Sequence, residues 1–198
     1  MRKRKVIFFT TVIISPIIIY FSFRPQIDEY FFSKHVIFWS KNVEVKFSDY
    51  QENPDYNSEL NISHFHGFYL LAKDIQTATV RAYFDKDQSW VKDTTKFDVQ
   101  AVKEFQKLRF DLNEVYARRF NAEIDKIRNN PNTTFEDLRN IGDEIYKQRN
   151  LMEDKLYSGE YSTEERVKIW RPVVDDLLEN SSKLPVTAAK QNGGFSVN

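Results

Sequence analysis

The sequence feature that most constrains the fold is a run of helical periodicity between residues 99 and 129. Apolar side chains recur there every three or four residues, the spacing that places them on one face of an α-helix. The series is Val102, Phe105, Leu108, Leu112, Val115, Tyr116, Phe120, Ile124 and Ile127. Asp98 stands before this run in the position of an N-cap, and the sequence NNPN at 129–132 ends it. The pattern therefore predicts one long amphipathic helix.

Two shorter helices are predicted after the long one. The sequences TFED (134–137) and STEE (162–165) each place a hydroxyl residue three positions before a carboxylate, the pattern of a capping box. The first of these helices should run to about Leu156 and end at YSG (157–159). In the second, Pro172 is expected to bend or interrupt the helix early.

The first half of the chain carries strand signals instead. Segments rich in β-branched and aromatic residues predict four strands: VIFW (36–39), VEVKF (43–47), NISHFHGFYLLA (61–72) and ATVRAYFD (78–85). The polar segments 48–60 and 86–95 are predicted as loops. Strands followed by helices indicate an α+β fold, in which an antiparallel sheet from the first half packs against three helices from the second half.

The N-terminus predicts a membrane anchor. Residues 2–5 are RKRK, and residues 6–23 contain no charge, which matches the lower end of a membrane span. Small residues do not stand at both −3 and −1 of a cut after Ser15 or Ser22, so a cleaved signal peptide is disfavoured against an uncleaved anchor. A buried core helix is the remaining alternative.

The basic cluster should stay in the cytoplasm, which would place the following domain in the periplasm or outside the cell. The expected organisation is a signal-anchor or transmembrane helix at 1–23, a stalk at 24–35, an α+β domain at 36–180 and a disordered tail at 181–198. The membrane contact would run through residues 6–23.

Composition excludes several function classes. The chain contains no cysteine, so disulfides, thiolate zinc sites and a cysteine nucleophile are absent. Four of the 29 basic residues lie in the first five positions, and the remaining 25 face 29 acidic residues. A nucleic-acid-binding domain is expected to be basic, so we do not expect nucleic acid as a partner.

His64 and His66 are the candidate metal ligands that the residues alone suggest. In a strand, the HFH sequence puts both rings on one face, and two such imidazoles can bind zinc. The sequence identifies no third ligand, so an ordinary polar strand face is the other interpretation. No pattern for a serine-histidine-aspartate triad is present either.

Four segments together resemble a known family. They are FWSKNVEVKFSDYQENPD (38–55), HFHGFYL (64–70), VRAYFDKDQSWVK (80–92) and FQKLRFDLNEVYARRF (105–120). In order and spacing they are similar to the bacterial domain of unknown function family 922, exported domains that look like zinc metallopeptidases. The last segment is similar to a family helix that reads H-E-x-x-H-F-D-x-x-E-x-Y-A-R. The resemblance covers roughly residues 36–178.

The departures from that pattern bear on function. The resemblance places Phe105 and Arg109 at the two zinc-binding histidines, Gln106 at the general base, and Tyr157 nearest to a further histidine. Phenylalanine offers no lone pair, arginine is always cationic, and glutamine cannot accept a proton in the base's role. The resemblance therefore implies a degenerate site without catalytic residues, bound metal or cofactor.

These observations lead to three functional expectations. The first is a membrane-anchored, catalytically inactive metallopeptidase-like domain that binds a protein, a peptide or an envelope component. The second is a hydrolase that holds a metal through His64, His66 and a carboxylate, and the third is a structural envelope protein without a ligand. The first also predicts that Arg109 pairs with an acidic residue, either Glu153 or Asp154.

Overall fold

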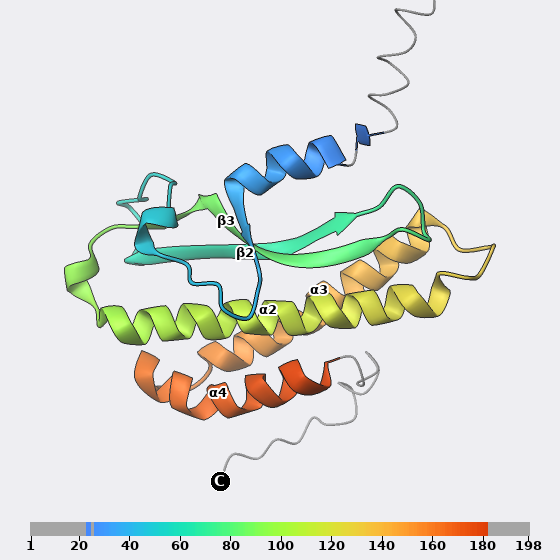
Figure 1. Ribbon diagram of the computed structural model, residues 1–198. Helices are drawn as coiled ribbons and strands as arrows, with labels where there is room; N and C mark the ends of the chain where they lie inside the picture. Colours follow the sequence, from blue (N-terminus) through green and yellow to red (C-terminus); the bar gives the residue numbers. More distant parts are fainter. Residues whose placement is uncertain (1–22, 25, 182–198) are drawn as a thin grey trace, which may run out of the picture. The chain divides into compact units, whose positions relative to one another are not determined.

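The computed structural model describes residues 23, 24 and 26–181 (Figure 1). It divides the chain into two units, Met1–Lys34 and His35–Asn198. The described part of the first unit, within the predicted stalk, is helical. Residues 1–22 of the predicted anchor and 182–198 of the predicted tail lie outside the described residues. Within the described ranges, no helix has the length and apolar character needed to cross a bilayer.

The second unit contains a three-stranded antiparallel sheet. Its strands are β1 (Val36–Phe38), β2 (Ile62–Leu71) and β3 (Thr79–Val91), in the order β1-β3-β2. The long strand β3 is central, so β1 and β2 are edge strands. Three helices from the second half of the chain complete this unit, which confirms the predicted α+β fold.

The helices begin where the sequence predicted. They are α2 (Val99–Ile127), α3 (Phe135–Tyr157) and α4 (Thr163–Asn180). The side chain of Asp98 caps α2, and capping boxes open α3 and α4 at Thr134 and Ser162. Beyond α3, Gly159 takes a positive φ of 78°, a conformation that a side chain would strain.

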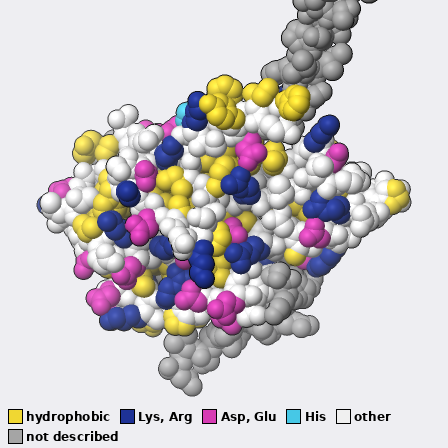
Figure 2. All heavy atoms as spheres, viewed as in Figure 1, with side chains coloured by type: hydrophobic (Ala, Val, Ile, Leu, Met, Phe, Trp, Pro, Cys, Tyr) yellow, Lys and Arg dark blue, Asp and Glu magenta, His cyan; other side chains and the backbone are white. Residues whose placement is uncertain are grey.

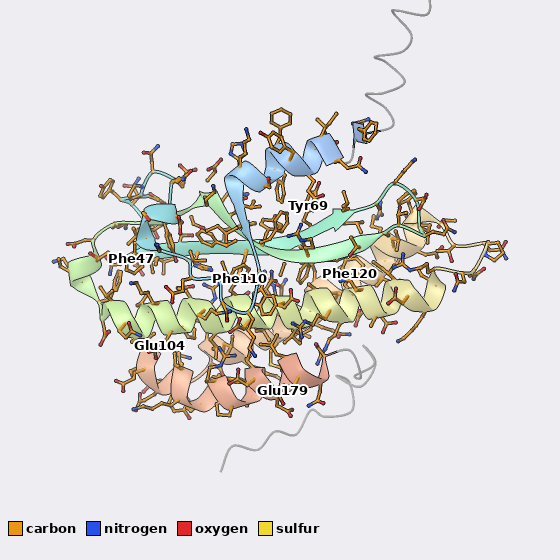
Figure 3. The ribbon with its side chains drawn as sticks, in the orientation of Figure 1. Phe47, Tyr69, Glu104, Phe110, Phe120 and Glu179 are labelled. Carbon is orange, nitrogen blue, oxygen red and sulfur yellow. The ribbon has the colours of Figure 1, made fainter. Side chains whose placement is uncertain are left out.

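The core lies around α2, which packs against the sheet on one side and against α3 and α4 on others (Figure 1). Phe110 and Phe120 extend from α2 toward the sheet and are at most 4% exposed (Figure 3). Leu138, Ile145 and Val174 contribute to the same core from the two later helices. Burial of such side chains stabilises the fold by roughly 1.5–3 kcal/mol each.

The prediction of a strand at residues 43–47 is wrong. The amide of Val43 bonds back to the carbonyl of Ser40 at 3.1 Å, which turns the chain away from the sheet. Residues 41–46 then cross α2, and a short 3₁₀ helix, η1 (Phe47–Asp49), follows (Figure 1). Val43 and Val45 pack against the core, so their apolar pattern reflects contact with helices instead of strand pairing.

Two further predictions need correction. Residues 86–91 belong to β3 and are not a loop, because Trp90 and Val91 pair with the start of β2. The loop that does follow contains a second 3₁₀ helix, η2 (Thr94–Lys96). Pro172 does not interrupt α4, which continues to Asn180. The carbonyl that Pro172 leaves without an amide donor belongs to the exposed Lys168, where water can hydrate it.

Candidate functional site

A large bulge in β3 lies opposite His64. Ser63 pairs with Trp90 and Phe65 pairs with Asp85, so the single residue His64 stands opposite residues 86–89. The Asp85 carboxylate accepts hydrogen bonds from the amides of residues 87 and 88 at 3.0 and 3.1 Å. Buried Ser89 donates its hydroxyl to the Asp85 carbonyl at 2.6 Å and accepts the Phe65 amide at 2.9 Å. Asp85 and Ser89 thus replace the strand pairing that the bulge removes.

His64 and His66 lie side by side on β2, as the alternation of a strand requires. Their ring centroids are 4.9 Å apart, and the residues are 7% and 5% exposed. The Tyr50 hydroxyl and His64 Nδ1 are 2.7 Å apart, within hydrogen-bond distance. The Nε2 atoms of both histidines are buried without a hydrogen-bond partner in the described part of the chain.

The electrostatic surroundings keep these rings neutral. Burial, together with the positive charge of Arg109, holds the pKa of His64 well below its usual range. The same two causes, in the same order, lower the pKa of His66. Burial also raises the pKa of Tyr50, so that its hydroxyl keeps its proton. At neutral pH this cluster therefore contains uncharged hydrogen-bonding groups.

The histidine pair has no carboxylate to complete a metal site within the residues described. No group of three or more histidine, aspartate or glutamate side chains is placed to hold a metal ion in those ranges. Zinc sites in proteins take three or four protein ligands. For a hydrolase with a metal held by His64, His66 and a carboxylate, the described residues thus supply the two imidazoles and no third ligand.

The pairing predicted for Arg109 is confirmed, with Glu153 as the partner in place of Asp154. Arg109 Nε donates to Glu153 Oε1 at 2.9 Å, and its Nη2 contacts the same oxygen. Arg109 Nη1 donates to Gln106 Oε1 at 2.9 Å. Residue 153 lies on α3, so this contact joins two helices that are distant in the sequence.

A second guanidinium binds the same carboxylate. Arg149 Nη1 contacts Glu153 Oε2, and Arg149 Nη2 donates to the carbonyl of His66 at 3.1 Å. The side chains of Arg109, Arg149 and Glu153 are only 12%, 13% and 16% exposed. Two partly buried positive charges therefore share one negative charge. The sequence prediction missed Arg149, although its i, i+4 spacing to Glu153 on one helix is a visible signal.

Phe105 and Tyr157 close the other side of this ion pair. Their rings meet edge to face with centroids 5.5 Å apart, and the Arg109 guanidinium lies 5.4 Å from the Tyr157 ring centroid. Burial raises the pKa of Tyr157. The structure thus brings together all four positions that the resemblance marked: Phe105, Gln106, Arg109 and Tyr157.

A pocket of about 480 Å³ opens beside these residues, between the segment 41–46, α2 and α4. Its most buried lining residues are His64, Gln106 and Phe110, which are at most 8% exposed. The charged residues around it are Lys41, Glu44, Lys46, Lys103, Glu104, Lys107 and Arg171. The pocket therefore combines a buried polar wall with five cationic and two anionic side chains.

The pocket was not predictable from the sequence, because residues 43–47 have the composition of a strand in the sheet. No local motif links that segment to α4. On the face shown in Figure 2, basic and acidic side chains are interspersed, with no large patch of one sign.

Side chains from α3 occupy part of the open edge of β2. The Phe68 amide donates to the Tyr146 hydroxyl at 3.3 Å, and the two rings lie 4.7 Å apart. Arg149 donates a hydrogen bond to the carbonyl of His66 on the same strand. An exposed strand edge can accept an added peptide strand through its free amides and carbonyls. Here α3 already satisfies two of those groups.

Asp111 connects three elements behind the pocket. Its carboxylate accepts hydrogen bonds from Trp39 Nε1 at 2.8 Å, Lys107 Nζ at 2.5 Å and Arg171 Nη1 at 2.8 Å. The residue is 4% exposed. Asp111 therefore fixes the start of the segment that crosses α2, and also fixes α4 against α2.

Comparison with known proteins adds no relative: no family model, no curated protein and no solved structure matches this chain.

Proposed function

We propose that the chain is a membrane-anchored, extracytoplasmic domain that resembles a zinc metallopeptidase and is catalytically inactive. The anchor is the apolar segment 6–23, with the basic N-terminus in the cytoplasm. The domain binds a protein, a peptide or an envelope component in the cleft beside α2. It uses no metal and no cofactor, and nucleic acid is not its partner.

The single observation that carries this proposal is the Arg109–Glu153 ion pair. In the resemblance, position 109 belongs to a zinc-binding histidine. A permanent cation there repels a divalent metal, and it binds the nearest carboxylate itself. Gln106 accepts a hydrogen bond from Arg109 and cannot act as a base, while Phe105 packs on Tyr157.

The pocket favours a binding role over a purely structural one. Ligand pockets typically measure about 300–1,000 Å³, and this pocket falls in that range. A structural protein gains nothing from leaving Gln106 and His64 in the wall of an open cavity. The edge of β2, by contrast, is partly taken by Tyr146 and Arg149, so the pocket is the better place for a ligand.

Metal content tests the catalytic half of the proposal. The full chain, purified in a nonionic detergent, is dialysed against zinc, and bound metal is measured by mass spectrometry. We expect less than stoichiometric zinc and no cleavage of a fluorogenic peptide mixture. Stoichiometric zinc that disappears when His64 and His66 are both replaced by Asn would refute the proposal in favour of the metal hydrolase.

Site-specific cross-linking tests the binding half. A photoreactive phenylalanine analogue replaces Asn42, which lines the pocket, in cells that express the chain. The matched control places the same analogue at Tyr56, which is 78% exposed and does not line the pocket. We expect a discrete adduct from position 42 alone. Identical adduct patterns from both positions would support the structural alternative.

A further inference from the structure

We infer that the pocket between residues 41–46, α2 and α4 binds a carboxylate that carries an apolar group, with Gln106 donating a hydrogen bond to it. This inference rests on the proposed function, because it assigns a ligand class to the same cleft. It follows from the charge behind the pocket, from the amide donor in its wall and from the residues at its mouth.

Positive charge is in excess behind the buried wall. Arg109 and Arg149 share the carboxylate of Glu153, and the described residues give neither guanidinium a second acidic partner. All three side chains are less than one-fifth exposed, so water screens the excess charge only weakly. A buried charge without a counterion is costly, and an anion in the adjacent pocket would reduce that cost.

Gln106 transmits this charge to the pocket. Arg109 has only donors, so the Gln106 oxygen must face Arg109, and the amide nitrogen is left for the other side. That nitrogen has no acceptor among the described residues, although Gln106 is 8% exposed and lines the pocket. Gln106 Nε2 is not among the fully buried atoms that lack a partner, so it is accessible from the pocket, and a ligand oxygen would supply an acceptor.

His64 adds an uncharged polar ring to the same wall. The ring is neutral, so only one of its nitrogens carries a proton. If the Tyr50 hydroxyl donates to Nδ1 across their 2.7 Å contact, the proton of the ring is on Nε2. That atom is buried without a partner, and His64 lines the pocket. Because Nε2 of His64 is closed to solvent, Gln106 is the side chain that presents an N–H donor to the cavity, where an oxygen of a carboxylate can accept it.

The mouth and walls define the rest of the ligand. Lys41, Lys46 and Lys103 have no acidic partner among the described residues and face the pocket, where they attract an anion. Phe110 and the valines 43, 45 and 167 form apolar walls beside Gln106. A carboxylate next to an aliphatic or aromatic group therefore matches the pocket. Such a group occurs at the C-terminus of a peptide and in small organic acids.

Calorimetric titration of the full chain in nonionic detergent tests the inference. The probes are N-acetyl-leucyl-leucine with a free carboxylate, the same dipeptide as its C-terminal amide, and 4-methylpentanoate. We expect the free acid to bind at least about tenfold more tightly than the amide, because a hydrogen-bonded charge is lost in the amide. Tight binding of 4-methylpentanoate identifies a small acid as the ligand, and weak binding identifies a peptide terminus.

Three variants locate the site. Gln106→Glu places a like charge at the carboxylate and should weaken binding of the free acid by about 10- to 100-fold. Lys103→Glu should weaken binding of the free acid by about two- to tenfold. Lys103 is exposed, so this change is not expected to unfold the domain. Lys168→Glu is the matched control, because Lys168 is exposed on α4 and does not line the pocket. It should leave the affinity unchanged.

Equal affinity for acid and amide, absence of binding by both at millimolar concentration, or equal effects of Lys103→Glu and Lys168→Glu would each overturn the inference. These results are independent of the zinc measurement. A chain that binds neither zinc nor the acid would still be an inactive domain with a different ligand. A chain that binds zinc would refute the proposed function whatever its affinity for the acid.

Discussion

Replacing Glu153 by Gln leaves the shape of the side chain intact and removes the charge that Arg109 and Arg149 share. Breaking a buried ion pair by removing one partner typically costs about 3–5 kcal/mol, since the other charge stays buried and unpaired. The three side chains are 12–16% exposed, and one of the two guanidiniums can still donate to the new amide oxygen, while the other faces the amide NH₂ group. We therefore expect the free energy of unfolding to fall by about 3 kcal/mol.

Urea unfolding of the full chain in nonionic detergent, followed by tryptophan fluorescence, measures this change. Its matched control is Glu164→Gln, which removes the partner of Lys168 from a pair whose side chains are 64% and 71% exposed. Exposed pairs contribute about 0–1 kcal/mol, so the control should lose less than about 0.5 kcal/mol. A loss at Glu153 no larger than the control's would refute the view that buried positive charge is in excess here.

Combining Glu153→Gln with Arg109→Met tests the same reasoning from the other side. If the cost of the first change comes from an unpaired Arg109, then removing that arginine should recover part of it. We expect the double variant to be more stable than the sum of the single effects by about 1–2 kcal/mol. Strict additivity would mean that Glu153 stabilises the fold through something other than this pair.

Two further predictions concern stability. Asp111→Asn should lower the free energy of unfolding by about 2–4 kcal/mol in urea, because two cations lose their buried counterion; a loss below 1 kcal/mol would contradict the bridging role. The lowered pKa values of His64 and His66 predict that the free energy of unfolding falls as the pH drops below about 6.5. In that range the two histidines bind protons in the unfolded chain and stay unprotonated in the folded chain. Unfolding titrations from pH 7.5 to 5.5 should show a slope of up to about 1.4 kcal/mol per pH unit for each ring. That slope should vanish in the double Asn variant and persist in His35→Asn.

The helices were predictable because their signals are local. Capping residues and the spacing of apolar side chains lie within a few positions of the elements they define. Asp98, Thr134 and Ser162 therefore mark the three starts correctly. Pro172 does not end α4 as predicted, because water can hydrate the carbonyl that loses its hydrogen bond there.

The sheet and the pocket were less predictable because they depend on partners far along the chain. Residues 43–47 carry the composition of a strand, yet they pair with no strand, and Val43 and Val45 pack against the core instead. Residues 86–91 look like a loop because they are polar, and the bulge that Asp85 and Ser89 stabilise is what lets the strand continue. Such choices are made by tertiary packing and not by local propensity.

Pairing of Arg109 was predictable for a physical reason. A cation on the inner side of a helix needs a nearby carboxylate, and the last turns of α3 are the acidic stretch that the expected fold brings close. The choice between Glu153 and Asp154 depends on helix rotation. Glu153 is the one whose i, i+4 neighbour, Arg149, reaches the same site.

A gain of zinc binding provides the most direct test of the proposed degenerate site. The rings of Phe105 and Tyr157 lie 5.5 Å apart, and the Arg109 guanidinium lies 5.4 Å from Tyr157. Two imidazoles that bind one zinc at about 2.0–2.1 Å have ring centroids about 5 Å apart. Replacing Phe105, Arg109 and Tyr157 by His should therefore create a three-histidine site. Glu153 would keep Arg149 as its partner.

We expect the triple variant to bind one zinc with a Kd below about 1 µM, because three converging imidazoles are the ligand set of many zinc sites. The control is the double variant with His at 105 and 109 and the native Tyr157. It lacks one ligand and should bind at least about 100-fold more weakly. Circular dichroism checks that both variants are folded. If the triple variant binds zinc no better than the double, these positions do not converge as a metal site requires. The ion pair at Arg109 would then be an ordinary contact between two helices, and the inactive-peptidase interpretation would lose its basis.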